Sequence, residues 1–353
     1  GKNATLDLNT NDLIVRGVDR FNFSDDSVTV FVQPDSSIVR IQKNRGVEFN
    51  GTVVASAFIF KGKEFKFDYD GFYIDLVKID SIIVKGKGSK GSVMKARKEL
   101  DWALTNKSKT SAGRLYINAP NNKSGRKKLG AYPSFDASTG AYVFFNKPEV
   151  LGGAYDTTMY FDIPPFKLDS LNNKNRAAVG FKGTFVSGGI MPDFKTKLSM
   201  QDDGSLGFVY DVPKAGFPLY GGKGTLYNKV SMSNRGLQGI GNIKYLTGSF
   251  NSEQFIFYRD SVVTVGTTAG ILPGPLGGTE FAKTDLLPGY QMKWVVRQDS
   301  MYLTTQPKGE AFRIYDVAYG FRGTLTYSPG GLRGNGAMDG PQSFVRSTAF
   351  QFR

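Results

Sequence analysis

The sequence predicts an all-β protein built as an antiparallel β-repeat array, either a β-solenoid or an elongated fold like a β-jellyroll, with one short helix near residues 92–106. Three observations support this fold class. The composition is rich in aromatic residues and glycine, with 28 Phe, 17 Tyr and 43 Gly among 353 residues. Aromatic side chains favour strands, and glycine favours the turns between them. The other two observations are apolar residues at alternate positions and short motifs that recur along the chain.

The clearest alternation lies at residues 65–76. Apolar and polar residues alternate there on both sides of Asp70 and Gly71, a dipeptide typical of a two-residue hairpin turn. Such a turn pairs Phe67 with Ile74 and gathers the apolar side chains of both strands on one face. We therefore expect a sheet with one dry face and one solvated face.

Two motifs recur at unequal spacings. Phe-x-Gly-Thr occurs at residues 49–52, 181–184 and 321–324, and Gly-Leu-x-Gly-x-Gly occurs at residues 236–241 and 331–336. Stacked β units need glycine where the backbone turns a corner or approaches a neighbouring strand closely. Each unit then buries its apolar face against the next one. The motifs therefore predict a decorated array of β units.

One stretch has a helical pattern. Ser92 is a suitable N-cap, and Val93, Ala96 and Leu100 fall on the same side of a helix that begins there. Several glycines precede this stretch, so we expect a single helix that packs over the sheet or bridges two modules.

The chain is longer than one typical domain. We predict a β module at 1–110 that ends in the helix, a second β module at 111–220, and a β-repeat module at 221–353. The last of these contains both Gly-Leu-x-Gly-x-Gly motifs. One continuous elongated domain is the alternative.

The chain contains no Cys and no His. This excludes Ser-His-Asp and Cys-His nucleophile pairs, and it removes the side chains on which common zinc, copper and haem sites depend. Carboxylate-pair chemistry stays open, although no pair of carboxylates stands out at a suitable spacing. We assign no catalytic residue, no cofactor and no metal ligand, and we favour a protein that is not an enzyme.

The formal net charge is +14, from 45 basic and 31 acidic residues. A basic balance suits an anionic partner, but it also suits a soluble surface with lysines on exposed sheet faces. We favour the second interpretation, and we expect the densest run, Arg126, Lys127 and Lys128, to be a solvated loop. Nucleic acid is disfavoured because basic and aromatic residues do not cluster on any one segment. No apolar run approaches about 18 residues, so we expect no transmembrane segment.

Lys87, Lys90 and Ser92 are candidate anion-binding residues. They surround the start of the expected helix, where backbone N–H groups and lysine side chains can hold an anion together. The glycines and lysines before the helix lack the ending of a phosphate-binding loop. We therefore favour a flexible basic linker, and an anion site is the alternative interpretation.

Tyr73, Tyr116, Trp102 and Trp294 are candidate ligand-facing aromatic residues. Their rings are suited to stack on sugars or bases. We favour the other interpretation, that they pack against neighbouring strands, as aromatic residues in β proteins commonly do.

Several stretches resemble long, repetitive cell-envelope proteins of Bacteroidetes-type bacteria. They are residues 13–18, 115–128 and 181–190 and the two Gly-Leu-x-Gly-x-Gly units. Those two units are also loosely similar to the repeats of OstA/LptA-like and TamB-like β-jellyroll proteins. The resemblance implies an extracytoplasmic β-rich scaffold, in the periplasm, at the outer membrane or on the cell surface. It brings no catalytic residues.

The leading hypothesis is a non-catalytic cell-envelope or surface protein that acts as a structural scaffold or binding surface. The expected partners are other envelope proteins or further repeats of a longer chain, with glycan or lipid as further candidates. One alternative is a periplasmic lipid-bridging β groove, which needs an open apolar face. Another is a carbohydrate-binding or glycan-cleaving protein.

Overall fold

The computed structural model describes residues 3–23, 30–84, 92–96, 112–172, 180–315 and 319–353. The all-β prediction is confirmed: within these residues the only helices are three-residue 3-10 turns. Contacts group the chain into two compact units, whereas the sequence analysis expected three modules. The first unit comprises Gly1–Phe144, Tyr160–Phe185 and Lys195–Leu206, and the second comprises Phe145–Met159, Val186–Phe194 and Gly207–Arg353.

The strands that lie wholly or mainly in the first unit are β1 (Ala4–Asp7), β2 (Asp12–Arg16), β3 (Phe21–Asn22), β4 (Val30–Pro34), β5 (Ile38–Ile41), β6 (Val47–Ala55), β7 (Phe58–Asp68), β8 (Tyr73–Val84), β9 (Ser92–Ala96), β10 (Gly113–Tyr116), β11 (Ser134–Ala137), β12 (Ala141–Phe144), β13 (Met159–Ile163), β14 (Phe166–Leu168), β15 (Gly180–Ser187) and β16 (Phe194–Met200). Two of the 3-10 turns also belong to this unit, η1 (Asp35–Ser37) and η2 (Pro120–Asn122).

The strands of the second unit are β17 (Leu206–Asp211), β18 (Phe217–Leu219), β19 (Gly224–Ser233), β20 (Gly236–Tyr245), β21 (Gly248–Phe257), β22 (Ser261–Val265), β23 (Thr268–Ile271), β24 (Gly274–Leu276), β25 (Thr279–Phe281), β26 (Thr284–Leu286), β27 (Gln291–Val295), β28 (Ser300–Thr304), β29 (Phe312–Ile314), β30 (Tyr319–Ser328), β31 (Gly331–Gly340) and β32 (Ser343–Phe352). The 3-10 turns η3 (Leu151–Gly153) and η5 (Val296–Gln298) complete it.

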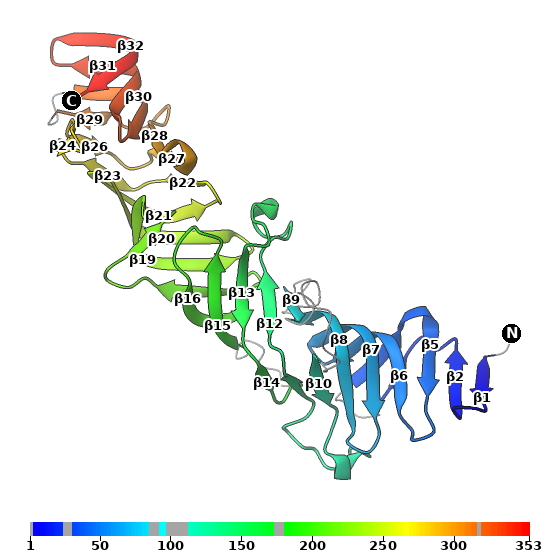
Figure 1. The fold of residues 1–353 in the computed structure, drawn as a ribbon. Helices are drawn as coiled ribbons and strands as arrows, with labels where there is room; N and C mark the ends of the chain where they lie inside the picture. Colours follow the sequence, from blue (N-terminus) through cyan, green and yellow to red (C-terminus); the bar gives the residue numbers. More distant parts are fainter. Residues whose placement is uncertain (1–2, 24–29, 85–91, 97–111, 173–179, 316–318) are drawn as a thin grey trace. The chain divides into compact units, whose positions relative to one another are not determined.

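Three long strands, β6, β7 and β8, form the centre of the first unit as consecutive antiparallel hairpins (Figure 1). The outer two of these strands, β6 and β8, each pair with one strand along their first half and with another strand further along. The first half of β6 pairs with β5 and its second half with β4, while the first half of β8 pairs with β10 and its last residues with β9. The sheet therefore divides into two walls that share the long strands.

We call these layers the first wall and the second wall. The first wall continues from the long strands through β5, β2 and β1 on one side and β10, β11 and β14 on the other. The second wall continues through β4 and β3 on one side and β9, β12 and β13 on the other.

The two walls pack on each other through buried aromatic rings. Phe60 of the second wall and Phe135 of the first wall are both fully buried, with ring centroids 4.7 Å apart. Phe23, next to β3, approaches Phe67 of β7 with centroids 4.4 Å apart. The apolar face predicted at residues 65–76 is thus covered by the opposite wall, and burial of these large rings is a main source of the unit's stability.

The register predicted for this hairpin is confirmed, because Phe67 lies opposite Ile74. The loop is longer than the two residues expected and spans residues 69–72. The carboxylate of Asp68 accepts a hydrogen bond of 2.6 Å from the backbone N–H of Gly71. This local bond supports the wider turn without shifting the strands.

Glycines mark the points where the long strands bend. Gly51 of β6 lies opposite Gly62 of β7, beside a register shift in the ladder. A Cβ atom on Gly62 would overlap the carbonyl oxygen of Lys78, and Gly51 has a φ of 141°. The first Phe-x-Gly-Thr motif therefore sits at a corner of the sheet, as the sequence analysis expected of its glycine.

The second unit repeats this arrangement around β19, β20 and β21. The two halves of β21 pair with β22 and β23. On one side, β22 pairs with β27, β27 with β28, and β28 with one half of β30. On the other side, β23 pairs with β26, β26 with β29, and β29 with the other half of β30. Together with β21 and β30, these strands close into a ring of eight.

This closure differs from the expected β-solenoid. The pairs described here are all antiparallel, and the bent strands β21 and β30 join the two sides of the second unit into one ring. The third set of long hairpins, β30, β31 and β32, follows on from the ring. Antiparallel pairing and bent central strands, rather than stacked coils, therefore build the interior.

The helix expected near residues 92–106 is wrong for residues 92–96, which form β9. This strand pairs with β8 through Ser92 opposite Val84, and with β12 through Ala96 opposite Ala141. Two strand edges offer hydrogen bonds there, and such tertiary pairing overrides a weak helical pattern. Residues 97–106 lie outside the described part of the chain.

Candidate functional site

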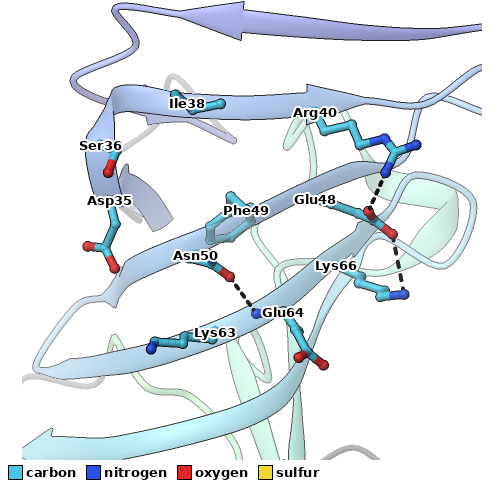
Figure 2. Close-up of a pocket in the computed structure, with 10 residues that line it drawn as sticks. All are labelled: Asp35, Ser36, Ile38, Arg40, Glu48, Phe49, Asn50, Lys63, Glu64 and Lys66. Carbon is cyan, nitrogen blue, oxygen red and sulfur yellow. Dashed lines mark hydrogen bonds and ion pairs between the residues drawn. The ribbon is translucent and has the colours of Figure 1, made fainter. Parts of the chain in front are cut away.

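A charged depression of about 530 Å³ opens on the first unit, over the corner of the bent strands (Figure 2). Its charged lining residues come from η1, β5, β6 and β7 and are Asp35, Arg40, Glu48, Lys63, Glu64 and Lys66. The buried ring of Phe49 lies between them. The depression is thus a polar surface over an apolar floor.

Two of the three carboxylates of this depression, Glu48 and Glu64, are neutralised by neighbouring cations. Glu48 lies between Arg40 and Lys66, at 3.9 and 3.3 Å, and Figure 2 shows its carboxylate pointing toward both. Glu64 is paired instead with Lys78 on β8. The two carboxylates therefore do not face each other across an open space, as a pair of glycosidase carboxyls must.

Asn50 explains the shape of the corner. Its side-chain oxygen accepts a hydrogen bond of 2.8 Å from the backbone N–H of Glu64 (Figure 2). The ladder shifts register between Phe49 and Gly51, so the side chain of Asn50 provides a partner where the strand ladder is interrupted. The depression follows from this bend in the sheet.

Two of the predicted aromatic residues come together on the outside of the first wall. Tyr73 of β8 lies directly opposite Tyr116 of β10, with ring centroids 5.7 Å apart. The Arg114 guanidinium lies 4.2 Å from the centre of the Tyr73 ring, and its Nε is 3.3 Å from the Asp75 carboxylate. Burial raises the pKa of Tyr73, so its hydroxyl stays protonated and able to donate a hydrogen bond. This half-buried group can contact a ligand on the surface.

Trp294, in contrast, is fully buried in the second unit, which corrects its assignment as a ligand-facing residue. Its ring packs against Tyr245 at 4.9 Å and against Tyr220 at 5.7 Å. Its indole Nε1 is buried without a hydrogen-bond partner in the described part of the chain. A ligand at the surface cannot reach this ring, and core packing, the interpretation favoured from the sequence, accounts for it.

The other predicted site residues are not brought together. Lys87, Lys90 and Trp102 lie outside the described residues. Ser92 begins a strand, so it does not cap a helix there. A helix N-terminus as the anion site therefore has no support at this position.

Sequence reasoning missed an aromatic residue held between two cations. Arg45 lies 4.9 Å from the ring centre of Tyr69, and the Lys123 ammonium lies 4.2 Å from it. These three residues come from three separate turns, so no local pattern pointed to the group. The only signal was the basic run that follows Lys123.

The described residues contain no group of three or more Asp and Glu side chains that could hold a metal ion. None of their helices has the length and apolar character needed to cross a bilayer.

Comparison of the chain with protein-family models, with curated proteins and with solved structures finds no match. What this protein does must therefore be inferred from its own residues and geometry.

Proposed function

We propose that this protein is a non-catalytic element of the cell envelope or cell surface, whose sheets serve as a scaffold or binding surface. The observation that carries this proposal is the filled interior of each unit. In the first unit Phe60 and Phe135 close the space between the walls. In the second unit Leu226, Phe250 and Leu325 are likewise fully buried. A filled interior leaves the outer faces and loops to carry the function.

The same observation weakens the lipid-bridging alternative. A conducting groove needs an apolar face that stays open along the strands. Phe65, Phe67, Phe72 and Ile74, on which that alternative depended, are each at most 7% exposed. Acyl chains would have to displace well-packed aromatic rings and would lose the packing that those rings make with each other.

Native mass spectrometry of the gently purified chain tests this proposal. We expect the mass of the polypeptide alone, because the apolar side chains of Phe65, Phe67, Phe72 and Ile74 are buried inside the first unit. Co-purifying lipid at stoichiometric levels would contradict the scaffold proposal and would support the lipid-bridging alternative. The envelope address is tested separately, by protease treatment of intact and lysed cells of the source organism.

A second candidate, carbohydrate binding, is favoured by aromatic pairs on outer faces. Tyr73 and Tyr116 form one pair. On β12 and β13, Tyr142 and Tyr160 form another, with ring centroids 5.3 Å apart, and both rings are half-buried. Tyrosine rings placed in this way can stack on sugar rings.

Binding to a panel of immobilised glycans tests the second candidate. Tyr116→Ala should lower binding of any retained glycan by about tenfold, the effect of losing one stacking ring and its hydroxyl. Tyr302→Ala, at a half-buried tyrosine of β28, is the matched control and should leave binding unchanged. Equal loss in both variants would argue against a site at Tyr116.

A further inference from the structure

We infer that the turns at one end of the first unit bind an acidic polysaccharide. The site consists of Tyr69 and the five cationic residues Arg45, Lys123, Arg126, Lys127 and Lys128, which we call the basic turn patch. This inference deepens the carbohydrate-binding candidate, and it names an anionic substrate class and a place on the fold.

Three turns meet at this patch. Arg45 lies between β5 and β6, Tyr69 between β7 and β8, and Lys123 in the loop between β10 and β11. In Figure 1 the loop from β10 lies at the same end of the strands as the β7–β8 turn. The two cation–ring distances of 4.9 and 4.2 Å show that the Tyr69 ring holds the cations of two different turns beside it.

The basic loop is held in place by a buried asparagine. Asn122 is 5% exposed. Its side-chain amide donates to the carbonyl oxygen of Lys127 at 2.7 Å and accepts from the N–H of Lys127 at 3.1 Å. It also donates to the side-chain oxygen of Asn118 at 3.2 Å. The loop expected to be merely solvated is therefore fixed from inside, in a conformation that presents its lysines and arginine.

The cations of the patch are largely free to meet an external anion. The side chains of Arg126, Lys127 and Lys128 are exposed and make no ion pair within the described part of the chain. The turn that carries Tyr69 adds two carboxylates, Asp70, which is 94% exposed and 3.8 Å from the Lys123 ammonium, and Asp68, which accepts from the N–H of Gly71. Five cations against two carboxylates, spread over one loop and one further turn, suit several anionic groups along a polymer better than a single small anion.

The neighbouring tyrosines favour a polysaccharide over a membrane surface. The ring of Tyr73 packs over Gly71, where a Cβ atom would overlap it, so this ring adjoins the turn that carries Tyr69. Tyr116 extends the tyrosine surface across the strand pair. A lipid surface instead recruits large exposed apolar side chains, and the only one in these turns is Leu129, at 36% exposure.

The test measures the affinity of the full chain for heparin and for polygalacturonate, at several salt concentrations. In one variant, Arg126→Gln, Lys127→Gln and Lys128→Gln are combined. The matched control combines Arg313→Gln, Lys308→Gln and Lys214→Gln, which removes the same charge from exposed positions of the second unit. We expect the patch variant to lose about tenfold in affinity and the control less than about twofold. Equal losses would mean that only the net charge of +14 attracts the polymer, and would overturn the inference.

Asn122→Ala tests the positioning role without changing charge. We expect weaker binding with an unchanged salt dependence, because the cations remain but their loop is no longer fixed. Thermal unfolding of the Asn122→Ala variant shows whether the fold is kept. If the fold is lost, the triple glutamine variant at Arg126, Lys127 and Lys128 alone decides whether the basic turn patch binds the polysaccharide.

Vesicles that contain phosphatidylglycerol provide the competing surface. Binding to them as tight as to either polysaccharide would overturn the polysaccharide assignment. If the basic turn patch proves not to bind an acidic polysaccharide, the scaffold proposal still stands. That proposal is tested by the lipid-free mass of the chain and not by the affinity for polyanions.

Discussion

Gly323 of β30 and Gly336 of β31 lie directly opposite each other in the strand ladder. Gly323 has a φ of 145°, and a Cβ atom on Gly336 would overlap the carbonyl oxygen of Arg322. The ladder shifts register at the same place, between Gly334 and Gly336. Two strands bend here together, and only residues without a side chain allow their backbones to approach so closely.

The Gly323→Ala variant should lose about 2–3 kcal/mol of unfolding free energy, because alanine is strained at this φ and its Cβ has no room. Urea unfolding measures the loss. Gly330→Ala is the control, since the nearest atom to its new Cβ would be the Ser328 hydroxyl at 3.6 Å. Comparable stability of the two variants would contradict a corner that depends on glycine.

The Phe60→Ala variant should lose about 3–5 kcal/mol, because it leaves a cavity between the two walls where Phe135 now packs. The control is Phe344→Ala, at a ring that is 64% exposed on β32, with an expected change within about 0.5 kcal/mol. Amide hydrogen exchange along a denaturant series follows the residues of each unit separately and measures both changes. Little effect at Phe60 would indicate that the walls are loosely packed.

Alkaline pH should weaken the second unit through Tyr155. Burial raises the pKa of this hydroxyl to about 12, while in the unfolded chain it is about 10. The hydroxyl donates to the carbonyl oxygen of Phe257 and accepts from the N–H of Leu237, both at 2.8 Å. Its contribution to stability is therefore complete below about pH 10 and is lost as the pH rises through about 12.

The Tyr155→Phe variant tests this dependence. At pH 7 it should be about 1–3 kcal/mol less stable than the parent, because it leaves a buried N–H without a partner. Between about pH 10 and 12 the difference in unfolding free energy should shrink, since the phenylalanine cannot ionise. A difference that stays constant over this range would show that Tyr155 does not titrate with the expected shift.

Asn50→Ala should destabilise the first unit by about 0.5–1.5 kcal/mol, because the N–H of Glu64 loses its acceptor at 2.8 Å. Asn50→Asp keeps an oxygen in the same place and should recover most of the loss. Lys63→Ala, in the same depression, is a surface control. If the aspartate variant were as unstable as the alanine variant, the hydrogen bond would not be the cause.

Local patterns predicted those parts of the fold that depend on neighbours in sequence. The alternation around Asp70 was sufficient to place Phe67 opposite Ile74, because side chains alternate between faces along every strand. The recurring glycines were expected at corners, and Gly51 and Gly323 lie at corners. The pattern after Ser92 favours a helix only when the edges of β8 and β12 are ignored, and pairing with these two strands makes the segment a strand.

By itself, the sequence determined the all-β class, the absence of imidazole and thiolate chemistry, and the register of its clearest hairpin. These properties follow from composition and from the two-residue period of a strand. The tertiary structure alone decided that Trp294 is buried, that the second unit closes into a ring, and that Arg45 and Lys123 meet at Tyr69. The reason is physical: each of these depends on which distant strands pair and which turns then share one end of a sheet, and long-range pairing is not encoded in any single stretch of the chain.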